Sequence, residues 1–163
     1  MENGYLQNGC GLIAAERVRQ EQSLGYSAEA DDSYTEEQLR DAAIAYAIVC
    51  DDRADNPPSC WPWDDNGFKY ESPKAANLVK AGALIAAEID RLHRAWRREC
   101  NEITTRDFGF ECFDEMNAYD LDQLPWIGVD PKEFVSKHFA EDYERLQWES
   151  DEALRAEEVD HGG

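Results

Sequence analysis

Basic side chains are scarce in this sequence. Of its 163 residues, 16 are Lys or Arg and 36 are Asp or Glu, which gives a formal net charge of −20. General nucleic-acid binding and docking on anionic membranes both depend on clustered Lys and Arg. The composition therefore argues against direct binding to nucleic acid and against binding to membranes. The 42% of hydrophobic residues and the 11% of aromatic residues are enough for a folded core.

Long apolar runs and paired metal-binding motifs are also lacking. No segment approaches the roughly 20 apolar residues that a membrane-spanning helix needs. Residues 1–15 lack the basic start and the apolar length of a signal peptide. The five cysteines are widely spaced, with no CxxC pair and no Cys/His cluster. We therefore expect a cytoplasmic protein with reduced thiols, no structural metal and no cofactor.

The apolar pattern predicts a mainly α-helical protein, a compact bundle of about four helices with a long tryptophan-rich loop. Alternating Phe108, Phe110 and Cys112 leave open a short β element near 106–113. We expect two parts, a helical core domain over 11–100 and an acidic C-terminal extension over 101–163 with a frayed tail. The predicted helices cover 11–24, 35–50, 74–99 and 131–148.

Individual residues set the expected limits and faces of these helices. Thr35 with Gln38 three residues later has the form of a capping box, and Gly25 is suited to end the first helix. Small residues around Gly82 should let a neighbouring helix approach closely. The apolar stripe expected to be buried on the third helix consists of Leu78, Ala81, Ile85, Ile89, Leu92 and Trp96.

A basic segment follows the tryptophan loop. Residues 67–100 hold 7 basic and 4 acidic side chains, whereas the segments on both sides are strongly acidic. Tryptophan rings can stack on a planar ligand such as a base, and Lys or Arg can bind its phosphates. The candidate ligand-binding residues are Arg17, Trp61, Trp63, Asp64, Lys69, Lys74, Lys80 and Arg91.

The same residues also have a structural interpretation. The two tryptophans can close the open end of a helical bundle, with Asp64 bound to an indole N–H or to the loop backbone. The basic segment can be neutralised by the acidic flanks of the same domain. Both interpretations stay open at the level of the sequence.

Catalytic motifs are weak. The sequence has no Gly-rich phosphate loop and no GxSxG motif, and its three histidines stand in no recognisable frame. Helical carboxylates could hold Mg²⁺ for a nucleotide pyrophosphohydrolase, a third alternative, but their spacing departs from the ExxE and ExxD motifs of all-α enzymes of that kind. These carboxylates are Glu36, Glu37, Asp41 and Glu88. We predict no catalytic residue and no metal ligand.

An ordered series of motifs resembles a known group of proteins. The series is ERVRQ, Asp31-Asp32, LRDAAIAYA, WPWD and NLVKAGALIAAEIDRL, within about residues 12–94. It is similar to the pattern ExxRQ, DD, AAxxYA, WPWD, NLVKAGALIxAEIxRL of a widespread family of small proteins encoded by phages and prophages. The resemblance implies a viral accessory protein that acts in the cytosol of a bacterial host. It implies no particular chemistry.

Two binding functions are therefore expected ahead of the enzyme, and a homo-oligomer is compatible with either. The first is a non-catalytic anti-defence protein that sequesters an anionic nucleotide-like ligand or host immune signal. The second is an acidic inhibitor that imitates nucleic acid in the basic groove of a host defence protein, such as a CRISPR effector or a nuclease. The residues expected to carry the second function are Glu141, Asp142, Glu144, Glu149, Asp151 and Glu152.

Overall fold

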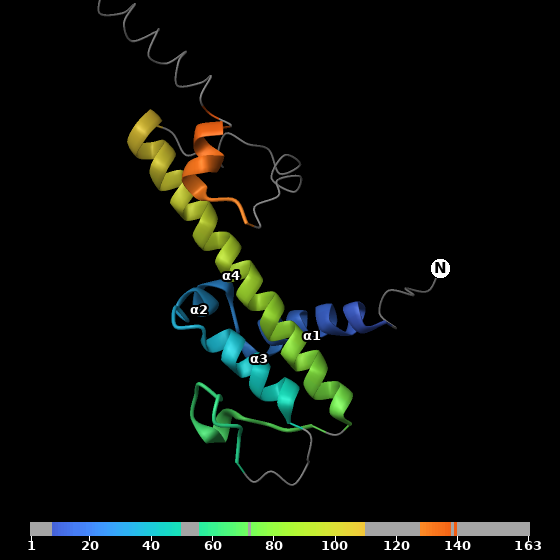
Figure 1. The fold of residues 1–163 in the computed structure, drawn as a ribbon. Coiled ribbons are helices and arrows are strands. Elements are labelled where there is room, and N and C mark those ends of the chain that lie inside the picture. Colours follow the sequence, from blue (N-terminus) through green and yellow to red (C-terminus); the bar gives the residue numbers. More distant parts are fainter. Residues whose placement is uncertain (1–7, 50–55, 72, 110–127, 138, 140–163) are drawn as a thin grey trace, which may run out of the picture. The chain divides into compact units, whose positions relative to one another are not determined.

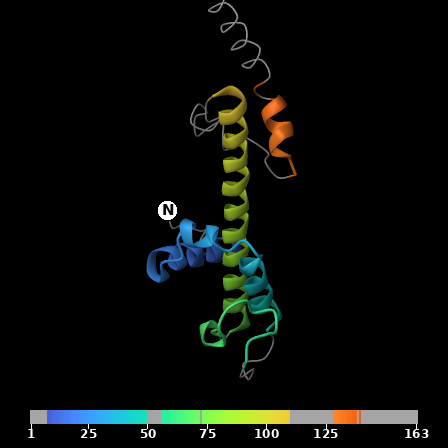
Figure 2. The same ribbon diagram turned by 90° about the vertical axis from the view of Figure 1, so that its left-hand side faces the viewer.

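The fold is all-helical throughout the part of the chain that the structure, a computed structural model, describes (Figure 1, Figure 2). This confirms the predicted mainly α class. The described residues are 8–49, 56–71, 73–109, 128–137 and 139. The elements in chain order are α1 (Gly9–Leu24), α2 (Ala28–Asp32), α3 (Gln38–Ile48), the 3-10 turn η2 (Asp65–Gly67), α4 (Lys74–Phe108) and a further helical stretch at 131–137.

Helix α1 ends where the sequence predicts. Asn8 caps its start, because the side-chain Oδ1 accepts a hydrogen bond of 2.9 Å from the Gly11 backbone N–H. Gly25 follows the last turn with φ of 74°, and its N–H donates to the Gln20 carbonyl. A left-handed residue at this position is favourable for glycine because it has no Cβ.

The short helix α2 lies between α1 and α3 in the chain. Ser27 caps it, with the Oγ accepting a hydrogen bond of 3.3 Å from the Ala30 N–H. Its acidic residues Glu29 and Asp31 lie in the first turn, where the helix dipole stabilises negative charge. The polar residues of this segment therefore stabilise the start of a helix. Asp31 is nevertheless buried.

Helix α3 starts later than predicted, and the capping box at Thr35 is wrong. The residue before the helix is Glu37, which has φ of 64° and makes no side-chain cap hydrogen bond. The Gln38 side chain instead accepts a hydrogen bond of 2.8 Å from the Glu36 N–H. The positive φ at Glu37 breaks the helical path, so the helix cannot begin at Thr35.

Helix α4 is longer than predicted. It continues through residues 106–108, so the β element suggested near 106–113 is not present there; residues 110–113 lie outside the described part. Gly109 ends it with φ of 81°, and its N–H donates to the Thr104 carbonyl at 3.0 Å. None of the described helices has the length and apolar character needed to cross a membrane.

Packing divides the chain into two units, Met1–Leu92 and His93–Gly163, with the division inside α4. The core of the first unit joins α3 to the first half of α4, which lies beside α1 and α3 in both views (Figure 1, Figure 2). Four partly buried rings pack against it, those of Tyr34, Trp61, Trp63 and Phe68. Its buried residues are Leu39, Ala42, Ala43, Tyr46, Ala81, Leu84 and Ala87.

The predicted buried stripe of α4 is wrong at most of its positions. Leu78, Ile85, Ile89 and Leu92 are between 41% and 57% exposed, whereas Ala81 and Trp96 are buried. The alanine face is inside because small side chains on both α3 and α4 let the two backbones approach closely. The close approach predicted around Gly82 is confirmed, since a Cβ at this position would meet Ile13 of α1.

The second unit has its own small core. The Trp96 indole Nε1 donates a hydrogen bond of 2.9 Å to the Val129 carbonyl, and its ring lies 4.9 Å from the Phe134 ring. Asp130 starts the following helix, with Oδ1 accepting hydrogen bonds from the N–H groups of residues 132 and 133. This confirms the predicted start of the helix at 131, whereas its predicted part after 139 lies outside the described residues.

Candidate functional site

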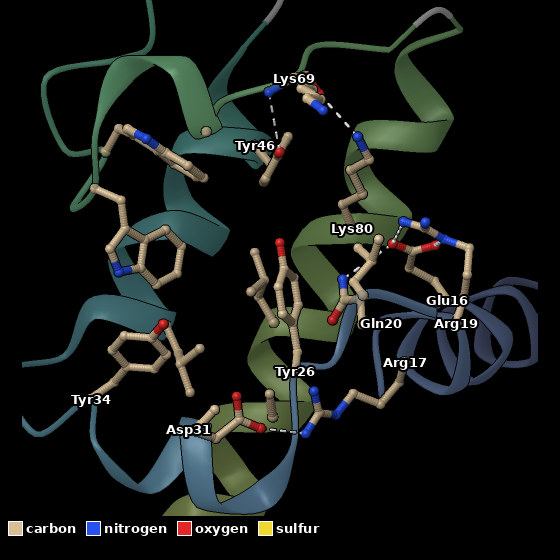
Figure 3. A pocket seen from close by; sticks show the side chains of 18 of the residues that line it. Glu16, Arg17, Arg19, Gln20, Tyr26, Asp31, Tyr34, Tyr46, Lys69 and Lys80 are labelled. Atoms are coloured by element: carbon tan, nitrogen blue, oxygen red, sulfur yellow. Dashed lines mark hydrogen bonds and ion pairs between the residues drawn. The ribbon is translucent and has the colours of Figure 1, made fainter. Parts of the chain in front are cut away.

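A cavity of about 500 Å³ lies within the first unit. Residues of α1, α2, α3, the loop 56–71 and α4 line it (Figure 3). Its volume falls in the range of about 300–1,000 Å³ that is typical of small-molecule sites. One side of its lining is aromatic and the other is polar and charged.

Edge-to-face ring contacts build the aromatic side. Trp63 lies 5.2 Å from the Tyr34 ring and 5.1 Å from the Trp61 ring, both centroid to centroid. Trp61 in turn lies 5.6 Å from Tyr46 and 5.1 Å from Phe68. The Trp61 indole Nε1 donates a hydrogen bond of 3.1 Å to a backbone carbonyl of the loop. These contacts fix the rings, and both tryptophans cover the core while they line the cavity.

The polar side includes a buried ion pair between α1 and α2. The Arg17 guanidinium donates to the Asp31 carboxylate, and the two side chains are 10% and 3% exposed (Figure 3). The Nε of Arg17 also lies 3.2 Å from Glu21 Oε1. An ion pair buried to this extent depends on both partners, because removing one leaves an uncompensated charge.

A second polar group lies within α1, on residues next to Arg17. Arg19 donates two hydrogen bonds, of 2.7 and 2.8 Å, to the Glu16 carboxylate. These bonds lower the pKa of Glu16 below its ordinary value, against the opposing effect of burial. The Gln20 Nε2 donates to the same carboxylate at 3.2 Å. The Oε1 of Gln20 is buried and has no hydrogen-bond partner among the described residues.

A third polar group joins α4 to the loop. The Lys80 ammonium donates 3.0 Å to the Lys69 carbonyl, lies 2.8 Å from a Glu71 carboxylate oxygen, and lies 5.1 Å from the centre of the Tyr46 ring (Figure 3). The Tyr46 hydroxyl accepts a hydrogen bond of 3.4 Å from the Lys69 N–H. Burial raises the pKa of the Tyr46 phenol. Buried Asn77 positions this loop, because its side chain accepts from the Glu71 N–H and donates to the Glu71 carbonyl.

Five of the eight candidate ligand-binding residues line this cavity: Arg17, Trp61, Trp63, Lys69 and Lys80. The other three do not line it. Asp64 is exposed, and its carboxylate accepts a hydrogen bond of 3.1 Å from the Asn66 N–H, while its carbonyl accepts from Trp61. Lys74 is the exposed first residue of α4. Arg91 pairs with Glu88 at 2.7 Å.

Several lining residues were not among the candidates predicted from the sequence. Gln20 and Asp31 are polar, and Tyr26, Tyr34 and Tyr46 lie in segments with no ligand-binding motif. A signal exists for Gln20, because it follows Arg17 by three positions and therefore lies on the same face of α1. No sequence signal pairs Arg17 with Asp31, which is 14 residues away.

The carboxylates considered for phosphohydrolysis do not gather at one place. Glu37 and Asp41 both pair with Arg40 on the surface of α3, and Glu88 pairs with Arg91 on α4. Within the described ranges, no group of three or more His, Cys, Asp or Glu side chains could hold a metal ion. The acidic residues considered for nucleic-acid mimicry, from Glu141 to Glu152, lie outside the described part.

Comparisons of this chain with protein-family models, with curated protein sequences and with solved structures give no match.

Proposed function

We propose that this protein binds and sequesters a small anionic, nucleotide-like ligand in the cavity of its first unit, without converting it. The observation that carries the proposal is the composition of the lining, in which fixed aromatic rings face cationic side chains across a space of about 500 Å³. A planar base fits the aromatic side, and a phosphate fits the cationic side.

The charge balance of the cavity supports an anionic ligand. The charged lining residues in the described part are four cations and three carboxylates, whereas the whole chain has a net charge of −20. Local positive charge in a strongly acidic chain attracts anions to this place rather than to the surface at large. The four cations are Arg17, Arg19, Lys69 and Lys80, and the three carboxylates are Glu16, Asp31 and Glu71.

Lys69 and Lys80 supply the donors for a phosphate. Lys80 directs its ammonium to the Lys69 carbonyl and to Glu71, which leaves one of its three donors for a ligand. The Lys69 side chain is exposed, and among the described residues no contact occupies its ammonium. A charge-assisted hydrogen bond to phosphate is about twice as strong as a neutral one.

Pairing of the cavity carboxylates supports binding without conversion. Glu16 pairs with Arg19, Asp31 with Arg17 and Glu71 with Lys80. The hydrogen bonds from Arg19 lower the pKa of Glu16, so this carboxylate is a weak proton acceptor and is poorly suited to act as a general base. The resemblance to small phage proteins extends the proposal to an anti-defence role, in which the ligand is an immune signal of the host.

Calorimetric titration of the full chain with nucleoside 5′-monophosphates and cyclic nucleotides tests the proposal. We expect Lys69→Ala to weaken binding roughly tenfold through the lost charged contact. We expect Trp63→Ala to weaken it roughly 5- to 100-fold through lost stacking. The matched control is Lys74→Ala, which removes an exposed lysine outside the cavity and should leave affinity unchanged. No binding by any probe, or equal losses at Lys69 and Lys74, would contradict the proposal.

A second candidate function is acidic mimicry of nucleic acid, which the net charge of −20 favours. Residues 101–163 hold 18 acidic and 5 basic side chains, the most acidic part of the chain. Such a protein should bind a basic host protein with a steep dependence on salt. Lysine substitutions at Glu141, Asp142, Glu144, Glu149, Asp151 and Glu152 should abolish this binding, while nucleotide binding in the first unit should remain.

A further inference from the structure

The buried side chain of Gln20 has a hydrogen-bonding capacity that the protein leaves unused. Gln20 is 4% exposed, and its Oε1 has no partner among the described residues. Figure 3 shows its amide at the cavity, between Glu16 and Tyr26. A buried acceptor without a partner destabilises a protein, so most such groups in native structures are satisfied by protein or by water.

The orientation of the Gln20 amide is fixed by its neighbour. An ionised carboxylate only accepts hydrogen bonds, and Glu16 accepts two from Arg19 and one from the Gln20 Nε2. A flipped amide would place its oxygen against this carboxylate, with two acceptors facing each other. The amide nitrogen must therefore face Glu16, and the carbonyl oxygen is the group that remains for a ligand.

No donor of the described residues makes a hydrogen bond to the Oε1 of Gln20. Arg17 donates to Asp31 and lies beside Glu21, and the ammonium of Lys80 is directed to the loop. The Oε1 of Gln20 is therefore available to a donor that comes with a ligand. In a nucleotide, the donors of a planar base are N–H groups, either an exocyclic amino group or a ring imide N–H.

We propose that Gln20 is a specificity-determining residue, which accepts a hydrogen bond from an amino or imide N–H of the base while the lysines bind the phosphate. This inference rests on the proposed function and adds the group of the base that the cavity recognises, an amino or imide N–H. A site that leaves a buried acceptor unpaired rejects analogues without the donor.

Two pairs of probes test the inference in the wild-type chain. AMP is compared with purine riboside 5′-monophosphate, which lacks the amino group, and UMP is compared with 3-methyluridine 5′-monophosphate, in which the N–H is blocked. In at least one pair we expect the donor-bearing nucleotide to bind roughly 5- to 100-fold more tightly. Equal affinities within both pairs would overturn the role of Gln20 but leave nucleotide binding standing.

Substitution of Gln20 separates recognition from a structural role. Gln20→Met keeps the length of the side chain and removes the acceptor, so it should weaken only the donor-bearing probe and bring the affinity ratio close to one. The matched control is Gln22→Met at an exposed position of the same helix, which should preserve the ratio. An equal loss for both probes of a pair in Gln20→Met would overturn the inference. Absence of binding by these four probes and by the other monophosphates and cyclic nucleotides would instead refute the proposed function, and this inference with it.

Discussion

Replacing Gly82 by alanine tests the contact between α1 and α4 that positions the polar side of the cavity. A Cβ on Gly82 would lie 2.5 Å from Ile13 Cδ1, 2.7 Å from Ile13 Cγ1 and 3.4 Å from Ile13 Cγ2. Cγ1 and Cγ2 are both attached to the Cβ of a branched side chain, so one rotation cannot relieve every contact. The substitution should therefore force α1 away from α4.

Two opposing effects set the change in the free energy of unfolding that Gly82→Ala causes. Alanine is favoured over glycine inside a helix by about 1 kcal/mol. Insertion of a methyl group into a tightly packed contact costs about 1–3 kcal/mol. We expect Gly82→Ala to lower the free energy of unfolding by roughly 1 kcal/mol in the wild-type background. In an Ile13→Ala background the crowding is absent, so the same change should raise the free energy of unfolding by about 1 kcal/mol.

Urea denaturation followed by circular dichroism measures this change of sign across the four proteins of the double-mutant cycle. The matched background is Val18→Ala, which shortens an exposed residue of α1 that is not near Gly82; there the loss of stability should remain. If Gly82→Ala changes the free energy of unfolding equally in the wild-type and Ile13→Ala backgrounds, α1 does not contact α4 at Gly82, and the predicted crowding is refuted.

Three further predictions concern the cavity. Asp31→Asn keeps the shape of the side chain but leaves the charge of Arg17 uncompensated, so it should lower the free energy of unfolding by about 3 kcal/mol in urea denaturation; a loss well below 1 kcal/mol would contradict the buried pair. Carbon-detected NMR should find the pKa of Glu16 below its ordinary value of about 4.3. Its contribution to stability is present above the unfolded-state pKa and is lost as the pH falls through the folded value; Arg19→Gln should return the titration toward the ordinary range, and no change would contradict the assigned cause. Burial raises the pKa of Tyr46, so its contribution is present below the ordinary tyrosine pKa of about 10 and declines as the pH rises above it. Tyr46→Phe should reduce this alkaline decline in stability, and an undiminished decline would count against the buried phenol.

Local signals explain which parts of the fold could be predicted. The end of α1 follows from Gly25 alone, and the start of the helix at 131 follows from Asp130 and Pro131. The start of α3 could not be predicted, because Glu37 adopts a positive φ although it is not a glycine, the residue that usually marks this conformation in a sequence.

The buried face of α4 shows why the apolar periodicity of the sequence was insufficient to predict the core residues of this helix. Large apolar residues such as Leu78 and Ile85 suggest a core stripe, but the core uses Ala81 and Ala87 because α3 also presents small residues. A single helix does not reveal the side-chain size on its neighbour. The apolar period alone therefore could not identify which face is inside.

Only part of the candidate site could be predicted from the sequence. Trp61 and Trp63 stand out by composition, and cations near them are easily recognised in the sequence. Gln20 and Asp31 do not stand out, because a buried polar residue becomes recognisable only through its partners in the folded chain. The pairing of Asp31 with Arg17 spans 14 positions and has no periodic signature.

Native mass spectrometry of the full chain, purified from bacterial cytosol, tests ligand capture most directly. Spectra before and after mild denaturation give the mass of any small molecule that leaves the protein. We expect a released anion of nucleotide mass from the wild type and from Lys74→Ala, and much less of it from Lys69→Ala. A wild-type chain that carries no such anion, and to which no added nucleotide binds, would contradict the proposal that its cavity is a nucleotide site.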